Sequence, residues 1–386
     1  MNPLDGILVP TFGAYDLAAT LLLPFVVIRL ISAERASGAW TILVQSRARV
    51  PGMVAIKAVA LVAAWGVALV PGFVAVLLWR SYGGHVNGAE LAPLLLGHLL
   101  RAGLTIGVAA AAAAVTEQSA SAAIVTLGVT VGSWALDFVA SVRGGMVERI
   151  AAFTPTATLR LFEQGLVRSS TVTVMFAVSL AGLAVATIWL DSASTPVRRL
   201  IRGAVALCTL GVLSAGLGQL RPSWDVTEDR RHSFPAEDAA ALRGLPAPLR
   251  VEVHLAAEDP RLADLRRGVL EKLERVVPHL ELVTSSSSST GLFARPDEHY
   301  GEVWYQVGAR RVMLRSTIEP VVLETIYGVA GVTPPPGREV ASVYGGFPLV
   351  ADAAYATPVF YLAWPLLVLL LAAVVRRPRL GRASRR

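Results

Sequence analysis

The stretch Ala204–Pro235, AVALCTLGVLSAGLGQLRPSWDVTEDRRHSFP, joins two segments of opposite chemistry. Residues 204–220 carry no charged side chain, whereas residues 221–235 contain three arginines, three acidic residues and a histidine. The apolar half belongs to a run at 200–219. A helix needs roughly 20 mostly apolar residues to cross about 30 Å of hydrocarbon, so this run is long enough to span a membrane. We therefore predict that the chain leaves a membrane near Trp224 and builds a polar block outside it.

Six further stretches are long and apolar enough to cross a membrane, and the composition agrees with them. The 386 residues are 54% hydrophobic, with a mean hydropathy of +0.56, which is too apolar for one soluble core. We expect an α-helical polytopic membrane protein with about seven transmembrane helices and an extracytoplasmic α/β domain inserted before the last helix. The expected spans are 13–31, 53–79, 92–116, 118–141, 171–190, 200–219 and 357–375.

The net positive charge of the chain comes from its membrane part. The formal net charge is +7, but residues 221–356 hold 15 basic and 19 acidic side chains, a net charge of −4. The remaining residues hold 20 basic and 9 acidic side chains. The cytoplasmic flanks of membrane helices are rich in Lys and Arg, so this excess of basic residues is expected of a protein whose partners include membrane lipids. We therefore predict no nucleic-acid partner.

Three basic clusters orient the spans. The tail 376–386 contains six arginines and is expected to stay in the cytoplasm of a prokaryotic cell, with the spans in its plasma membrane. Counting back puts loops 32–52 and 191–199 in the cytoplasm, and the N-terminus and residues 221–356 outside it. The start MNPLDGILVP has no positive n-region, so we expect no signal peptide. The two loops are flanked by Arg29, Arg35, Arg47, Arg49 and Lys57, and by Arg198, Arg199 and Arg202.

Residues 142–170 should lie on the outer side, between two spans. Apolar and charged residues alternate there at helical spacing, and Pro155 interrupts the run. This pattern favours two short amphipathic helices at the outer interface, with an ordinary surface loop as the alternative.

The polar block reads as an α/β domain. Ser233 is a candidate helix cap and Pro235 suits the first turn of a helix ending near Leu245. A strand at 249–255, a helix at 259–277 and a strand at 280–284 then form a β-α-β unit, and EVWYQVG and RRVMLRS form a hairpin. The serines at 285–289 read as a flexible loop.

No catalytic motif is present in the sequence. It contains no HExxH, no GxSxG and no GxxxxGK[ST], so we expect neither an enzyme nor a directly bound cofactor. A zinc or hydrolase site remains as a minor alternative. The one cysteine, Cys208, excludes disulfides within the chain.

Ionisable residues also lie within the predicted spans, where each costs a few kcal/mol unless it is paired or hydrated. His98 and Arg101 are one turn apart on one helix face, and Asp137 and Asp16 lie near the outer ends of their spans. We predict that the side chain of Arg101 reaches Asp137. The pair either lines a polar pathway or locks two helices together. Lys57 is expected to extend its ammonium group to the cytoplasmic interface.

The loop between the first two spans, SAERASGAWTILVQSRARV, contains an amphipathic stretch in which Leu43 and Val44 follow Trp40 at helical spacing. A short, charge-flanked interfacial helix offers a surface to a partner. The same charges are alternatively explained as positive-inside anchors.

This loop resembles the first cytoplasmic loop of the permeases of type-2 ABC exporters. The resemblance implies that Glu34 and its neighbours dock on a separate ATPase subunit, that ATP is used only through that subunit, and that two permease halves pair as a homodimer or heterodimer. Ala39 stands where the family usually has Thr. The family's first helix has no counterpart before residue 13, so the order is expected to begin at the second. The loop residues concerned are Glu34, Arg35, Gly38, Leu43 and Lys57.

The start of the polar block is similar to the auxiliary subunit of gliding-motility-type ABC transporters, in a pattern matched by Asp225, Thr227, Ser233 and Pro235. Trp224 precedes it as a candidate member of the aromatic belt, and Asp225 with Thr227 should cap the turn that leads outward. The chain thus resembles two fused subunits. The expected parts are a permease-like domain at 1–195, a helix at 196–220, the auxiliary domain at 221–356, a helix at 357–375 and the tail at 376–386.

Two functions follow as expectations. The first is a permease subunit that couples ATP hydrolysis by its partner to export or to transport related to the cell envelope or surface. The second is a membrane-anchored scaffold or binding protein whose outer domain recruits envelope machinery without transport. A scaffold does not need an ATPase-docking loop, so the segment around Glu34 distinguishes the two.

Overall fold

The computed structural model describes residues 2–45, 49–143, 147, 151, 154–191, 193–220, 222–256, 259–284, 299–335 and 357–376. Within these ranges six helices are long and apolar enough to cross a membrane, and a shorter apolar helix covers Tyr361–Ala373. The chain is a helical, multi-pass membrane protein. The six long helices are Leu4–Ala36, Val50–Ser81, Gly88–Val115, Ser119–Ala140, Ser169–Leu190 and Pro196–Leu217.

The first two spans are each built from more than one helical segment. The first contains η1 (Leu4–Leu8), α1 (Val9–Leu21) and α2 (Leu23–Ala36), and the second contains α4 (Val50–Ala68) and α5 (Val70–Ser81). Pro24 and Pro71 lie in the first turns of α2 and α5, where proline removes a backbone donor and interrupts the preceding helix. The remaining long helices are α6 (Gly88–Val115), α7 (Ser119–Arg143), α10 (Ser169–Leu190) and α11 (Pro196–Leu217).

The first long helix extends beyond the predicted span 13–31 at its N-terminal end. Helical structure begins at Leu4, since η1 runs directly into α1 and Pro10 is accommodated in the first turn of α1. Asp16 therefore lies 12 residues along this helix.

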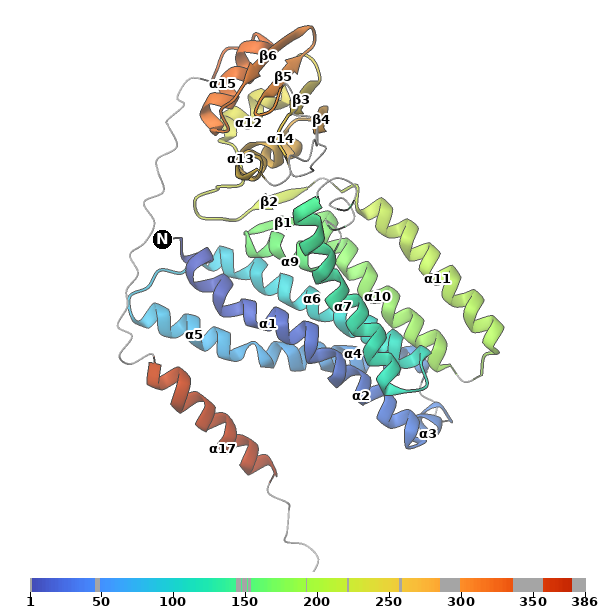
Figure 1. The fold of residues 1–386 in the computed structure, drawn as a ribbon. Helices are drawn as coiled ribbons and strands as arrows, with labels where there is room; N and C mark the ends of the chain where they lie inside the picture. The colour runs from blue at the N-terminus through green and yellow to red at the C-terminus, as the bar shows by residue number, and fades with distance from the viewer. Residues whose placement is uncertain are drawn as a thin grey trace, which may run out of the picture.

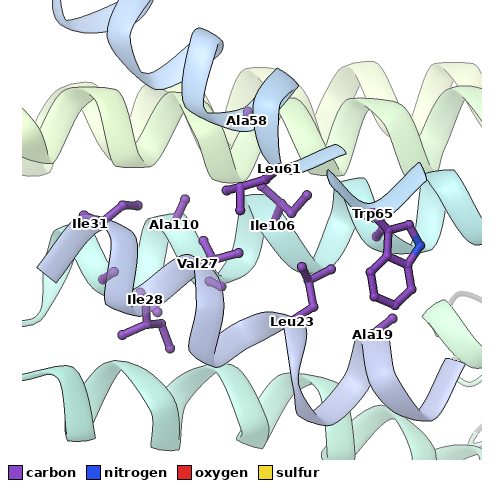
Figure 2. Packing of buried hydrophobic residues seen from close by; sticks show 14 of the residues in the cluster. Ala19, Leu23, Val27, Ile28, Ile31, Ala58, Leu61, Trp65, Ile106 and Ala110 are labelled. Atoms are coloured by element: carbon purple, nitrogen blue, oxygen red, sulfur yellow. The ribbon is translucent and has the colours of Figure 1, made fainter. Parts of the chain in front are cut away.

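Helix α6 is the centre of the bundle, with α2, α4, α7 and α10 packed around it (Figure 1). Figure 2 shows Val27 of α2 and Leu61 of α4 meeting Ile106 and Ala110 of α6 in this core. The contact of α6 with α10 is the most extensive one between described helices.

The end of the bundle nearer the α/β domain is covered by a short helix and a two-stranded sheet. Helix α9 (Pro155–Glu163) buries Leu159 and Phe162, which confirms the second of the two predicted amphipathic helices. The first falls on residues 142–153, most of which lie outside the described residues. Strand β1 (Leu166–Arg168) follows, where a helix was expected, and pairs antiparallel with β2 (Ser223–Asp225).

The α/β domain stands beyond this sheet (Figure 1). Strands β3 (Leu249–Val253) and β4 (Leu280–Thr284) are parallel and are joined by α13 (Pro260–Leu265), η2 (Arg266–Leu270) and α14 (Glu271–Val276). Strands β5 (Val303–Val307) and β6 (Arg310–Leu314) form the hairpin, and the sheet order is β4-β3-β5-β6. The predicted β-α-β unit and hairpin are thus confirmed. Helix α15 (Glu319–Ala330) was not predicted, and the serines at 285–289 lie outside the described residues.

The predicted cap of the first helix in this domain was wrong. Helix α12 (Ala236–Arg243) has Pro235 at its N-cap position and receives no side-chain cap hydrogen bond. Ser233 is two residues too early, and Pro235 precedes the first turn because its extended backbone, with ψ of 148°, cannot belong to the helix.

The last helical segment consists of η3 (Val359–Ala363) and α17 (Trp364–Arg376). It stands apart from the bundle in Figure 1, and its leucines at 366, 367, 369, 370 and 371 are exposed, as expected of a helix surrounded by lipid. Residues 377–386 of the basic tail lie outside the described residues. The N-terminus lies at the same end of the bundle as the α/β domain, while the connections α2–α4 and α10–α11 lie at the opposite end.

Candidate functional site

The short helix α3 (Ala39–Gln45) lies at the end of the bundle remote from the α/β domain. Gly38, with φ of +74°, ends α2 in the left-handed region and turns the chain into α3. Trp40 is buried, and its Nε1 donates a hydrogen bond to the carbonyl oxygen of Leu190 at 3.1 Å, which ties α3 to the end of α10. Ile42 and Leu43 are exposed, so α3 has an apolar face that the described part of the chain does not cover.

Two charged residues at the end of α2, just before α3, fix that end of α2 to the bundle. Glu34 accepts a hydrogen bond from Nζ of Lys57 at 2.5 Å, which joins α2 to α4. Arg35 donates to the carbonyl oxygens of Ala113 at 2.7 Å and Thr116 at 2.8 Å, which satisfies the last carbonyls of α6. Lys57, which was expected to extend its ammonium group to the interface, pairs with Glu34. A displacement of α3 would therefore act on α2, α4, α6 and α10 together.

The deepest charge in the bundle is Arg101, whose side chain is fully buried. Its Nε donates to Asp16 Oδ1 at 3.0 Å and its Nη2 donates to Thr20 Oγ1 at 2.8 Å. His98 lies one turn away, with its ring 6.0 Å from that of Phe12 and without a hydrogen-bond partner for either ring nitrogen among the described residues. Arg101, Asp16 and Thr20 of α1 and α6 thus form one buried cluster, with His98 one turn from Arg101.

The predicted pair of Arg101 with Asp137 was wrong. Asp137 pairs with Arg160 of α9, with Nη2 and Oδ2 2.7 Å apart. Arg101 and Asp16 lie about 20 and 18 Å along helices that start at the same end of the bundle, whereas Asp137 is only about 9 Å from the end of α7, at 1.5 Å per residue. The two charges nearest in depth are therefore the ones that meet.

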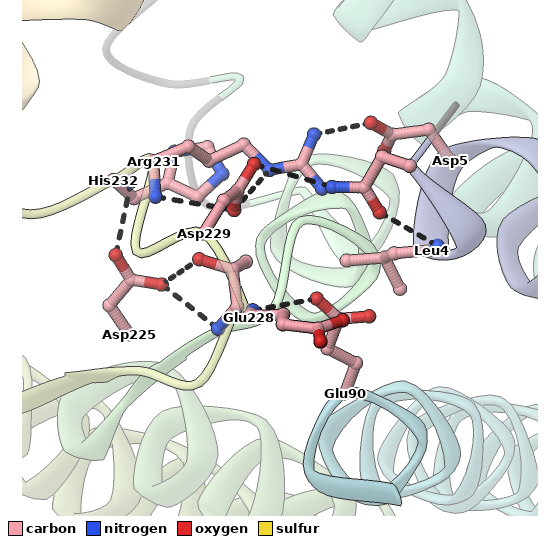
Figure 3. Close-up of polar contacts among 10 residues, drawn as sticks. Leu4, Asp5, Glu90, Asp225, Glu228, Asp229, Arg231 and His232 are labelled. Atoms are coloured by element: carbon pink, nitrogen blue, oxygen red, sulfur yellow. Dashed lines mark hydrogen bonds and ion pairs between the residues drawn. The ribbon is translucent and has the colours of Figure 1, made fainter. Parts of the chain in front are cut away.

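The chain segment that enters the α/β domain is fixed to the bundle by polar contacts (Figure 3). The backbone N–H of Glu228 donates to Glu90 Oε1 of α6 at 2.9 Å, and Arg231 forms an ion pair with Asp5. Asn2 also donates to Asp229 at 3.4 Å. We call residues 223–232 and these partners the junction.

Asp225 organises the junction from within. Its Oδ1 accepts from the backbone N–H of Thr227 at 3.1 Å and from the Thr227 hydroxyl at 2.5 Å, and its Oδ2 accepts from the N–H of His232 at 3.0 Å. The predicted turn-capping role of Asp225 and Thr227 is confirmed. Burial lowers the pKa of His232 and so favours its neutral ring. Trp224 is 55% exposed, as an aromatic-belt residue would be.

Sequence reasoning missed several of these partners. Thr20 could have been predicted as a partner of Arg101, since it lies one turn after Asp16 on the same helix face. Arg160, Glu90 and Asp5 carried none, because their partners are remote in sequence and only the packing of the elements brings them together.

The contacts around α3, the Arg101 cluster and the junction connect helices and domains to one another. Within the described ranges no group of three or more His, Cys, Asp or Glu side chains lies close enough to hold a metal ion. No protein-family model, curated protein or solved structure matches the chain.

Proposed function

We propose that the chain is the membrane-spanning permease subunit of an ABC transporter and couples ATP hydrolysis by a separate subunit to export or to transport related to the cell surface. The observation that carries the proposal is α3, a short helix between two spans that buries Trp40 and exposes Ile42. A partner that binds such a helix can displace it, although the helix itself does not cross the membrane. The sequence supplies no phosphate-binding loop, so ATP hydrolysis requires that partner.

The contacts of Arg35 and Lys57 favour a role in transmitting a displacement of α3 over a role as simple membrane anchors. Lys and Arg residues that only anchor a membrane helix extend into water or lipid headgroups. Here Arg35 and Lys57 are engaged with the end of α6 and with Glu34. We assign Glu34 and Arg35 to transmitting displacement of α3, and the exposed apolar face of α3 to contacting the ATPase. In this proposal α3 lies in the cytoplasm and the α/β domain outside the plasma membrane.

Purification of the full chain together with the products of its neighbouring genes tests this function, and the measurement is the recovery of an ABC ATPase with the chain. Ile42→Asp places a charge on the exposed face of α3, and we expect recovery of the ATPase to fall about tenfold, since a central apolar contact becomes an unpaired charge. Val197→Asp is the matched control, because Val197 is 67% exposed at the α3 end of the bundle, in the first turn of α11.

The outcomes separate the two candidate functions. Loss of the ATPase with Ile42→Asp but not with Val197→Asp supports a permease. Equal recovery with both variants would contradict docking through α3. Wild-type protein that reaches the membrane and recovers no ATPase would instead favour the membrane-anchored scaffold.

A further inference from the structure

Two adjoining cavities lie where the α/β domain meets the end of the helical bundle. The first, of 660 Å³, lies between Arg168 and Ser170 at the start of α10, residues 218–220 after α11, and residues of α12 and α14. The second, of 500 Å³, lies between the junction and the same two helices of the domain. Arg243 and Arg275 line both. The cavities therefore form one recess at the level where α10 and α11 leave the apolar layer.

The charged side chains that line the recess are mainly cations. The first cavity has Arg168, Arg243 and Arg275, and the second has Arg230, Arg243, Lys272 and Arg275. Lys272 is neutralised by Glu319, with Nζ and Oε2 2.7 Å apart. The four arginines form no ion pair with a carboxylate of the described residues.

Two of these arginines are half-buried, and each has a buried nitrogen whose donor is unused. Nε of Arg168 and Nη1 of Arg275 are inaccessible to solvent and have no hydrogen-bond partner among the described residues. Nη2 of Arg275 donates to the carbonyl oxygen of His232, which holds this side chain in the recess. Burial and the charge of Arg168 lower the pKa of Arg275. Buried donors without a partner are costly, so these positions are built for an acceptor that the chain does not supply.

The acidic groups of the recess do not supply it. Asp225 uses both carboxylate oxygens within the junction. Glu274 lines the first cavity but lies beyond ion-pair distance of the arginines, and burial raises the pKa of its carboxyl group. The recess therefore keeps a net positive charge.

We propose that this recess binds a phosphate group at the membrane surface. Arginine binds phosphate through paired, charge-assisted hydrogen bonds, and a cluster from two structural units suits a tetrahedral oxyanion with several acceptors. The exposed Trp224 beside the second cavity is suited to the headgroup layer. The group comes from the headgroup of an anionic phospholipid or from free phosphate. The site does not depend on the proposed transport function.

The test uses the full-length protein and two probes. Native mass spectrometry measures retention of phosphatidylglycerol against phosphatidylcholine after extraction from nanodiscs that contain both. Thermal unfolding in detergent measures the shift caused by inorganic phosphate. In the double variant Arg168→Gln/Arg243→Gln we expect apparent affinity for the bound probe to fall about tenfold or more, and binding by the wild type to weaken as NaCl is raised.

Arg243→Gln alone keeps the test valid if the double variant fails to fold, since Arg243 is exposed on α12. Arg267→Gln is the matched control, because Arg267 is an exposed arginine of the same domain that lines neither cavity. Arginine-dependent retention of phosphatidylglycerol assigns the site to lipid, and an arginine-dependent shift with phosphate alone assigns it to free phosphate. Absence of both effects, or an equal loss in Arg267→Gln, would overturn the proposal.

Discussion

Arg101 holds a positive charge deep inside a membrane helix, and Asp16 and Thr20 compensate it. A carboxylate and a guanidinium buried together are tolerable in hydrocarbon, while either one alone is not. The cluster contributes to stability only as a unit.

We predict strong coupling between Arg101 and Asp16. Arg101→Ala and Asp16→Ala should each destabilise the protein by about 3–5 kcal/mol, because each leaves the opposite charge buried and unpaired. The double variant should cost clearly less than the sum of the two. Thermal unfolding of the four proteins in detergent gives the coupling energy.

Arg160 and Asp137 form the control pair. The Arg160 side chain is 58% exposed, so the same cycle should give a coupling of about 1 kcal/mol or less. Additive effects at Arg101 and Asp16 would mean that the two charges are compensated separately.

The residue types of this cluster were predictable from the sequence, and the pairing was not. Charges inside apolar runs are visible at once, but choosing between Asp16 and Asp137 required the true depth of each residue. That depth depends on where the first helix starts, and Pro10 hid the start at Leu4.

At the scale of elements, α6 and α10 pack with their backbones in contact. A Cβ atom on Gly182 would lie 2.4 Å from the carbonyl carbon of Gly107, and one on Gly107 would lie 2.6 Å from the carbonyl oxygen of Ser179. Small residues allow membrane helices to approach this closely and gain van der Waals contact.

Gly182→Ala should therefore destabilise the protein by about 1–3 kcal/mol, because the backbone of α6 must move away. Gly128→Ala in α7 is the matched control, since a Cβ there meets no atom within 4 Å. Thermal unfolding in detergent compares the two. Equal stability of both variants would show that the α6–α10 contact is looser than described.

Strands with clear alternation were predictable at this scale, and short ones were not. Val251, Val253, Tyr305 and Val307 alternate with polar residues and face one core, so β3 and β5 were expected. Strands β1 and β2 have three residues each and lie 54 residues apart, too short and too remote for any periodic pattern. Only the arrangement of α9, α10 and α11 brings them together.

At the scale of the whole molecule, α3 and the α/β domain occupy opposite ends of the bundle (Figure 1). The six long helices separate the two ends, so we predict that α3 and the domain face opposite sides of the membrane. Because basic residues gather near α3, we expect that end to face the cytoplasm.

We predict that an impermeant thiol reagent will label intact cells carrying Cys208→Ala/Asp264→Cys, and will not label cells carrying Cys208→Ala/Thr41→Cys. Asp264 and Thr41 are both exposed, in the α/β domain and in α3 respectively. After cell lysis both should react, which controls for intrinsic reactivity. Labelling of Thr41→Cys in intact cells would reverse the orientation.

The β1–β2 pair has a mechanical consequence. Along the chain the α/β domain follows α11, which is largely exposed, but β2 is hydrogen-bonded to β1, the strand immediately before α10. Tension applied to the domain is therefore shared with α10 and, through the Gly107–Gly182 contact, with α6 at the centre of the bundle. A force that pulls on the domain therefore acts on α10 through the β1–β2 pair as well as on α11, which directly precedes the domain in the chain.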